Sequence, residues 1–399
     1  MGELGKFKNG INKGKDDFGH GFPFVNLMDV FGIPKISTST TEFGLVNTTA
    51  AERDLYELRG GDVLFVRSSV KPEGVGLTTL IPQDLPNTVF SGFLIRFREC
   101  GLLELGFKEH CFWDEGFRAR LIPNSTVSAN TNINQDALKR LQIAFPPTLL
   151  EQRSIATALS DMDELLGGLD RLIAKKRDLK QAAMQQLLTG ETRLPGFDSE
   201  WEVKRLGDLG HFLKGSGVKK DQTRSGNLPC IRYGEIYTYH NDHIKSFNSW
   251  ISPEVARTAT MLKKNDILFA GSGETKEEIG KCVAFIDDFE AYAGGDTVIL
   301  RPSNVNAIFL GYYCNTAPVN LQKASKGQGD AVVHISANAL ASIELTIPDI
   351  LEQTSIASIL SDMDTEIAAI EQRRNKTRDL KQAMMQELLT GRIRLKIET

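Results

Sequence analysis

A glycine-rich stretch in the second half of the chain is the segment that comes nearest to a phosphate-binding loop. It reads GSGETKEEIGK over residues 271–281. A Walker A loop has four residues between its glycines and then Lys followed by Ser or Thr. Here six residues separate Gly273 from Gly280, and Cys282 follows Lys281. A dinucleotide-binding fingerprint fails as well, because Lys276 stands where its third glycine is required. The stretch therefore predicts no nucleotide site.

Other signatures of catalysis are missing from the sequence. It contains no HExxH, no GxSxG and no Asn/Asp-Pro-Pro-aromatic run, which is the adenine-methyltransferase motif. The five cysteines are scattered and form no CxxC pair, so they indicate neither zinc nor a disulfide framework. His240 and His243 are the one spaced histidine pair, and Asp242 is their only acidic neighbour. We expect no catalytic residue and no metal site.

Basic and hydroxyl side chains in loops are the chemistry that remains, and such groups can contact the phosphates and base edges of DNA. In the first half the candidates are Lys6, Lys13, Lys15, Arg67, Ser68 and Lys71. In the second half they are Lys214, Lys219, Lys220, Arg232, Tyr233, Ser272, Lys276, Lys281 and Lys326. Any one lysine is more readily explained as a solvated surface residue. The recurrence of the group at matching places in both halves favours DNA binding.

Length and composition describe a globular protein of two ordinary domains, with 399 residues, 41% hydrophobic and 25% charged. No apolar run is long enough to span a membrane, and the first residues do not resemble a signal peptide. We expect a cytoplasmic protein. Its net charge of −4 does not favour DNA binding by this chain alone, because phosphate contacts usually require a basic surface.

An internal repeat organises the chain. Residues 147–190 reappear at 348–391, 201 positions later, with 23 identities over the 40 positions from Glu151 to Gly190. Fainter matches extend outside this block, among them GGDVLFVRSS at 60–69 with KNDILFAGSG at 264–273. The predicted organisation is module one at 1–145, a helical spacer at 146–195, module two at 196–347, a second spacer at 348–392 and a tail at 393–399.

The elements that must position these loops differ between modules and spacers. Short apolar runs such as DVLFV and DILFA suit buried strands, and frequent Gly and Pro indicate compact α+β modules with many loops. The spacers have the three- and four-residue apolar spacing of a coiled-coil helix, capped by Gly190 and Gly391. The main seam residues are Ile155, Leu159, Met162, Leu187, Ile356, Leu360, Met363 and Leu388.

Charge along the two spacers predicts how they pair. Acidic residues such as Asp163 and Asp364 come early in each helix, and basic residues such as Lys180 and Lys381 come late. Antiparallel packing sets each acidic half against the other helix's basic half. The alternative is that early acids and late bases simply suit the helix dipole.

At this point the sequence resembles a known family. One order of motifs occurs twice in the chain: a DIL-type strand, a Gly-rich loop, an apolar run ending in Pro, and then a long helical block. In the first copy this block reads LLEQRSIATALSDMD…RDLKQAAMQQLLTG. This arrangement is similar to the specificity subunits of type I restriction–modification systems. The resemblance implies an α+β fold with two target recognition domains, each reading half of a bipartite site in double-stranded DNA. It also implies two antiparallel spacers related by a pseudo-twofold axis.

The same resemblance implies partners and cofactors. The seam residues of the spacers would bind two modification subunits, which methylate adenine with S-adenosylmethionine. Restriction subunits that use ATP and Mg would join the assembly, and this chain itself would hold no cofactor and catalyse nothing. Module two has the lead-in FDSEWEVKRL at 197–206, whereas module one begins about eight residues too late to have one.

Two other functions compete with this interpretation. One is the recognition fragment of a fused restriction–methylation enzyme, which the completed second helix and short tail argue against. The other is a coiled-coil scaffold, which does not explain two loop-rich modules that diverge while their connecting helices stay alike.

Overall fold

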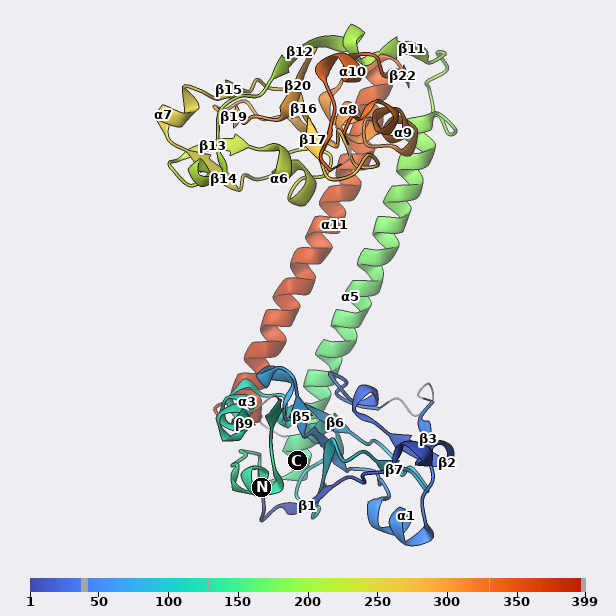
Figure 1. Ribbon diagram of the computed structural model, residues 1–399, viewed down its shortest axis with the longest axis vertical. Coiled ribbons are helices and arrows are strands. Elements are labelled where there is room, and N and C mark those ends of the chain that lie inside the picture. The colour runs from blue at the N-terminus through green and yellow to red at the C-terminus, as the bar shows by residue number, and fades with distance from the viewer. Residues whose placement is uncertain (37–41, 128–129, 330, 396–399) are drawn as a thin grey trace. The chain divides into compact units, whose positions relative to one another are not determined.

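Two compact units make up the chain in the computed structural model, which describes residues 1–36, 42–127, 130–329 and 331–395. Unit 1 comprises Met1–Arg171 and Glu371–Thr399, and unit 2 comprises Leu172–Ile370. The division falls inside both long helices. Each unit therefore joins one module to half of each helix (Figure 1).

Module one is built around a four-stranded antiparallel sheet in the order β1-β8-β4-β6. Its strands are β1 (Gly5–Asn9), β4 (Val63–Val66), β6 (Thr78–Leu80) and β8 (Leu94–Glu99). Every residue of β4 is buried, since alternate side chains point to opposite faces of a strand and both faces are covered. Val63 and Phe65 enter one hydrophobic cluster, and Leu64 and Val66 enter another.

Two smaller sheets and several short helices complete module one. The sheets run β3-β2-β7, with β2 and β7 parallel, and β5-β10-β9. The strands are β2 (Phe18–Val25), β3 (Gly44–Val46), β5 (Ser68–Ser69), β7 (Val89–Phe90), β9 (Thr126–Val127) and β10 (Thr131–Asn132). The helices are α1 (Ala50–Tyr56), α2 (Leu105–Cys111), α3 (Glu115–Leu121) and α4 (Gln135–Arg140), with 3-10 turns η1 (Lys15–Asp17), η2 (Leu27–Asp29), η3 (Pro72–Gly74) and η4 (Ile122–Asn124).

Module two repeats this plan with the sheet orders β12-β20-β16-β18, β14-β13-β19-β15, β17-β21 and β11-β22. The strands are β11 (Glu202–Arg205), β12 (Gly210–Lys214), β13 (Leu228–Ile231), β14 (Ser249–Ile251), β15 (Thr260–Met261), β16 (Asp266–Ala270), β17 (Ser272–Gly273), β18 (Cys282–Phe285), β19 (Tyr292–Ala293), β20 (Thr297–Pro302), β21 (Val333–His334) and β22 (Glu344–Ile347). The helices are α6 (Tyr233–Thr238), α7 (Pro253–Ala256), α8 (Ala307–Tyr313), α9 (Ala317–Lys326) and α10 (Ala337–Ala341), with η5 (Leu206–Leu209) and η6 (Lys220–Gln222).

The main sheets of the two modules are equivalent strand by strand. β1, β8, β4 and β6 correspond to β12, β20, β16 and β18, and β13 pairs in parallel with β19 as β2 does with β7. The repeat seen in the sequence is thus a repeat of the fold, and the predicted α+β class is confirmed.

Two long helices follow the modules. α5 covers Leu149–Thr189, and α11 covers Ile350–Met384 and continues as a π-helical turn, η7 (Met385–Leu389). Gly190 and Gly391 end them with φ of +75° and +73°. This left-handed conformation is what makes glycine the usual residue after a helix.

The halves of α5 and α11 that share a unit run antiparallel, as the charge pattern predicted. In unit 1, Lys381 Nζ lies 2.5 Å from Asp163 Oδ1. In unit 2, Lys180 Nζ lies 2.7 Å from Asp364 Oδ1. Each late base of one helix therefore meets an early acid of the other, which parallel packing could not achieve.

The start of each long helix is fixed by the same buried dipeptide, Glu-Gln. Gln152 Nε2 donates to the carbonyl of Pro146 at 2.9 Å, and Gln353 Nε2 donates to the carbonyl of Pro348 at 2.8 Å. Both glutamines are fully covered, at 0% and 2% exposure, so their amides must be satisfied inside the protein. This need explains why an apolar helix start carries the same polar pair in both repeats.

Candidate nucleic-acid interface

The loops that carry most of the predicted DNA contacts of module two meet at one edge of its main sheet. β12 and β16 both end there, and β20 begins there between them. Backbone hydrogen bonds tie the loops together, from Gly215 N to Thr297 O and from Gly271 N to Asp296 O, both 2.8 Å. We call residues 215–220, 271–276 and 294–296 the loop edge of module two.

Module one has the same edge, formed by residues 10–15, 67–71 and 91–93. Gly10 N donates to Leu94 O at 3.0 Å, and Arg67 N donates to Phe93 O at 2.8 Å. The second bond is the counterpart of the Gly271–Asp296 bond of module two. The two modules therefore present the same loops in the same way.

On the loop edge of module two, the structure brings several predicted residues together. Lys214, Lys219 and Lys220 are exposed, and Arg232 is half-buried with its stem beside Gly294. A pocket of about 320 Å³ lies at this edge, lined by Lys214, Leu213, Gly271, Ser272, Asp296, Thr297, Val298, Lys326, Gln328, His334, Ile335, Ser336 and Ala337. Three predicted residues, Lys214, Ser272 and Lys326, thus face one cavity of mixed polar and apolar lining.

Two of the predicted hydroxyl-bearing residues in module two are held within the protein. Ser272 is 2% exposed, and its Oγ lies 2.8 Å from Nδ1 of His334. Tyr233 packs against the hydrophobic core at the start of α6. Lys276, in contrast, is exposed in the loop after β17.

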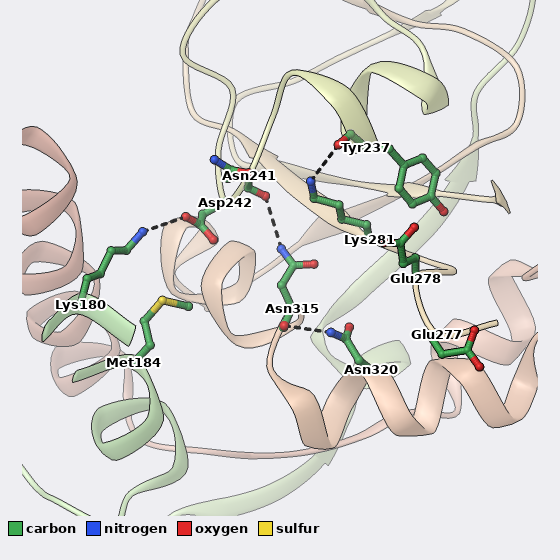
Figure 2. Close-up of a pocket in the computed structure, with 10 residues that line it drawn as sticks. All are labelled: Lys180, Met184, Tyr237, Asn241, Asp242, Glu277, Glu278, Lys281, Asn315 and Asn320. Carbon is green, nitrogen blue, oxygen red and sulfur yellow. Dashed lines mark hydrogen bonds and ion pairs between the residues drawn. The ribbon is translucent and has the colours of Figure 1, made fainter. Parts of the chain in front are cut away.

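The side chain of Lys281 does not line the pocket at the loop edge, and the DNA contact predicted for it stays a prediction. Figure 2 shows its amine directed at the backbone carbonyl of Tyr237, 3.3 Å away. It lines a pocket of about 480 Å³ within unit 2, together with Lys180, Met184, Tyr237, Asn241, Asp242, Glu277, Glu278, Asn315 and Asn320. Burial lowers the pKa of the Lys281 ammonium. The pocket holds acids as well as bases, which does not suit a phosphate.

In module one, four predicted residues lie at the loop edge and are accessible. Lys15 and Lys71 are exposed, Ser68 is half-buried, and the Arg67 guanidinium donates to the carbonyl of Gly92 at 3.2 Å. These positions leave three positive charges and one hydroxyl group available to a ligand.

The positions of the other two predicted lysines of module one, Lys13 and Lys6, do not favour the DNA contact predicted for them. Lys13 forms an ion pair with Glu52 at 2.8 Å, so its charge is already paired. Lys6 lies opposite Arg98 on β8, toward the other end of β1 and away from the loop edge. A DNA contact from either is not supported by its position.

Both the sequence and the structure of the chain are similar to those of known proteins. Residues 198–377 match the type I restriction modification DNA specificity domain. A putative type I restriction enzyme MjaX specificity subunit of Methanocaldococcus jannaschii is 27% identical over 287 residues, covering 67% of this chain and 62% of that protein. The type I restriction enzyme MjaVIII specificity subunit of the same organism is 22% identical, and the match covers 66% of this chain and 65% of that protein. Residues 198–377 therefore carry this DNA specificity domain, and the chain is similar to type I restriction enzyme specificity subunits.

The chain spans less than two thirds of the length of either relative. Solved structures of low identity show the same fold over nearly all of it. An S subunit from M. genitalium has a TM-score of 0.55 at 15% identity, covering 97% of this chain and 94% of that one. The HsdS subunit of Thermoanaerobacter tengcongensis has a TM-score of 0.55 at 18% sequence identity, and the match covers 98% of this chain and 96% of that one. A third structure, from a study of complex assembly in the type I system, has a TM-score of 0.59 at 16% identity, and the match covers 98% of each chain. A fused enzyme fragment is not favoured.

Six of the eight side chains predicted to bind modification subunits are buried inside this chain, and their role in docking stays a prediction. Ile155, Leu159 and Leu388 belong to the core of unit 1. Leu187, Ile356 and Leu360 belong to the core of unit 2, and Met363 packs against it. Met162 is half-buried on α5. The seam spacing marks two faces of each helix: its start packs on the module that precedes it, and its end, at Leu187 or Leu388, packs in the core of the other unit.

Several residues of the interface were missed by sequence reasoning. Phe93 and Asp296 precede the middle strands of the two sheets, and Gln328 and His334 line the pocket of module two. The weak repeat outside the helices contained a signal, because aligning the strands places Phe93 on Asp296. Among the described residues, no three His, Cys, Asp or Glu side chains gather as metal ligands would, and no helix is long and apolar enough to cross a membrane.

Proposed function

We propose that this specificity subunit reads a two-part DNA target, with the loop edge of each module on one half. The observation that carries the proposal is the repetition of that edge, framed by the same backbone bonds and bearing exposed basic side chains in both modules. Phosphate contacts position such a reader, while other loop side chains specify bases. Because the loops differ between modules, the two half-sites differ in sequence.

The chain acts in an assembly and is not itself the catalyst. With a net charge of −4 it lacks the basic excess of a protein that holds DNA alone, and two modification subunits supply the missing contacts. They bring S-adenosylmethionine, and restriction subunits bring ATP and Mg. All five cysteines are free thiols, which suits the cytoplasm.

Exposed leucines at equivalent places in the two long helices fit a docking surface for the modification subunits. Leu150 on α5 is 51% exposed, and Leu351, its equivalent on α11, is 71% exposed. Each sits one turn or less from the buried Glu-Gln pair, on a rigid helix start. Two equivalent surfaces suit two copies of one partner.

Exchange of residues 1–145 for another module tests the reading role. In cells carrying the complete system, mapping of methylated adenines is expected to show one half-site changed and the other retained. A change in both half-sites, or in neither, would contradict the proposal.

Single charges on the two helix starts test the docking role. Leu150→Asp and Leu351→Asp should each remove one modification subunit from the purified complex, and the double variant should remove both. Leu55→Asp, which changes a leucine of equal exposure on α1 of module one, is the matched control. Unchanged stoichiometry in the double variant would rule this surface out.

A further inference from the structure

The two loop edges carry opposite chemistry at equivalent positions. Phe93 corresponds to Asp296, because their carbonyls accept the matching bonds from Arg67 and Gly271. Val70 follows β5, and Glu274 follows the equivalent strand β17. Module one is therefore apolar where module two bears two carboxylates.

The apolar positions of module one form the walls of a pocket. Val70 and Phe93 are 82% and 57% exposed, and Met28 on η2 is 78% exposed. The pocket measures about 460 Å³ and is lined by Leu27, Met28, Phe31, Ser68, Ser69, Val70, Lys71, Phe93 and Asn130. Four separate chain segments thus meet at a site where large apolar side chains are exposed to solvent. A contiguous exposed patch of this kind marks a binding surface.

The surroundings of the pocket indicate DNA as its occupant. The pocket is continuous with the loop edge, and Lys71 on its wall and Arg67 beside it supply positive charge. Asp296, the equivalent of Phe93, lines a pocket of module two with Lys214 and Lys326, and that pocket shares the Ser272 and Asp296 positions with the pocket of module one. Both pockets therefore occupy the part of the module that faces the half-site under the proposed function.

We propose that Val70 and Phe93 read thymine through its 5-methyl group. In the major groove the thymine methyl is the one apolar group that a base pair presents, and apolar side chains are its usual contacts. An open apolar pocket can take a protruding methyl group, whereas carboxylates at the same positions suit the amino group of cytosine. The inference rests on the proposed function and adds the chemical identity of one base contact.

Uracil substitution in the target tests this contact directly. The complex of the full chain with its modification subunits is titrated with duplexes that carry the mapped site. Replacing thymine by uracil in the half-site of module one removes only the methyl group. We expect the affinity to fall about threefold to fivefold for each thymine that is contacted, from the free energy of burying one methyl.

Variants then connect the effect to the pocket. Phe93→Ala should weaken binding of the thymine duplex and leave the uracil duplex nearly unchanged, so that the ratio of the two affinities approaches one. Val70→Ala, at a still more exposed position, should act in the same direction. Leu102→Ala, an apolar surface position after the far end of β8, should keep the ratio of the unaltered complex.

Equal affinity for thymine and uracil duplexes in the unaltered complex would overturn the proposal. So would a half-site without thymine, or a ratio that Phe93→Ala and Val70→Ala leave intact. In each case specific binding is still measured, so the proposed function survives. Failure of the complex to bind any duplex specifically would instead contradict the proposed function.

Discussion

Arg98 holds the buried carboxylate of Asp62 in a two-pronged pair, with Nε 2.7 Å from Oδ1 and Nη2 2.6 Å from Oδ2. Asp62 is 1% exposed and precedes β4, whereas Arg98 lies on the neighbouring strand β8. Arg301 and Asp266 form the same pair in module two at 2.8 and 2.7 Å. The pair fixes the middle strands of both sheets, on which the loop edges depend.

Removing the guanidinium should destabilise the module. Arg98→Ala leaves Asp62 buried without its cation, and breaking such a pair costs about 3 kcal/mol. The free energy of unfolding from urea denaturation measures the loss. Arg59→Ala, which removes only an exposed pair with Glu57, is the control and should cost under about 1 kcal/mol. Equal effects of the two variants would contradict this role.

The pairing of the long helices was predictable from sequence because the charges that decide it are ordered along each helix. The face that each helix buries was not predictable in the same way. Ile155 and Leu159 show the same spacing whether the helix packs on another helix or on a domain. The structure buries them in the core of module one, a packing partner that the spacing alone does not specify.

The loop edge was foreseeable only in part. The lysines near Lys214 and the Gly-rich stretch after residue 270 were recognisable as loops by their composition. Their meeting depends on the sheet order β12-β20-β16, which the separate strand sequences do not encode in any local pattern. Phe93 and Asp296 were therefore missed, because they matter only once β8 and β20 are known to lie in the middle.

Charge reversal should test the antiparallel helices within unit 1. Lys381→Glu faces Asp163 with a like charge and should lower the free energy of unfolding by about 0.5–1 kcal/mol. The double variant Lys381→Glu with Asp163→Lys restores opposite charges and should regain most of this loss. Additive effects in the double-mutant cycle would mean that the two side chains do not interact.

Phosphate contacts at the loop edge should appear in the salt dependence of binding. Lys219→Ala and Lys220→Ala, in the assembled complex, should each reduce the slope of log affinity against log salt concentration by about 0.9, as expected for one lost phosphate contact. Lys6→Ala is the matched control, because Lys6 is exposed but lies away from the loop edge. A slope change for Lys6 equal to those for the other two would place the interface elsewhere.

His240 should make unit 2 sensitive to acid. Its ring is 4% exposed, and within the described part of the chain its Nε2 has no hydrogen-bond partner. Burial, assisted by the positive charge of Lys281, lowers the pKa of His240 from 6.5 to about 4. Above pH 6.5 the His240 ring is neutral in both the folded and the unfolded state, so its protonation does not change the free energy of unfolding there.

As the pH falls from 6.5 to 4, only the unfolded state gains the proton, and folding stability is lost. The loss from this one group amounts to about 3 kcal/mol. His240→Gln cannot titrate, so its free energy of unfolding should fall less steeply over this range than that of the unaltered chain. His211→Gln, at an exposed position on β12, is the matched substitution with which the His240 variant is compared. If the His240→Gln curve runs parallel to that of the unaltered chain, the ring is protonated in the folded state at the same pH as in the unfolded state, and its burial is not maintained in solution.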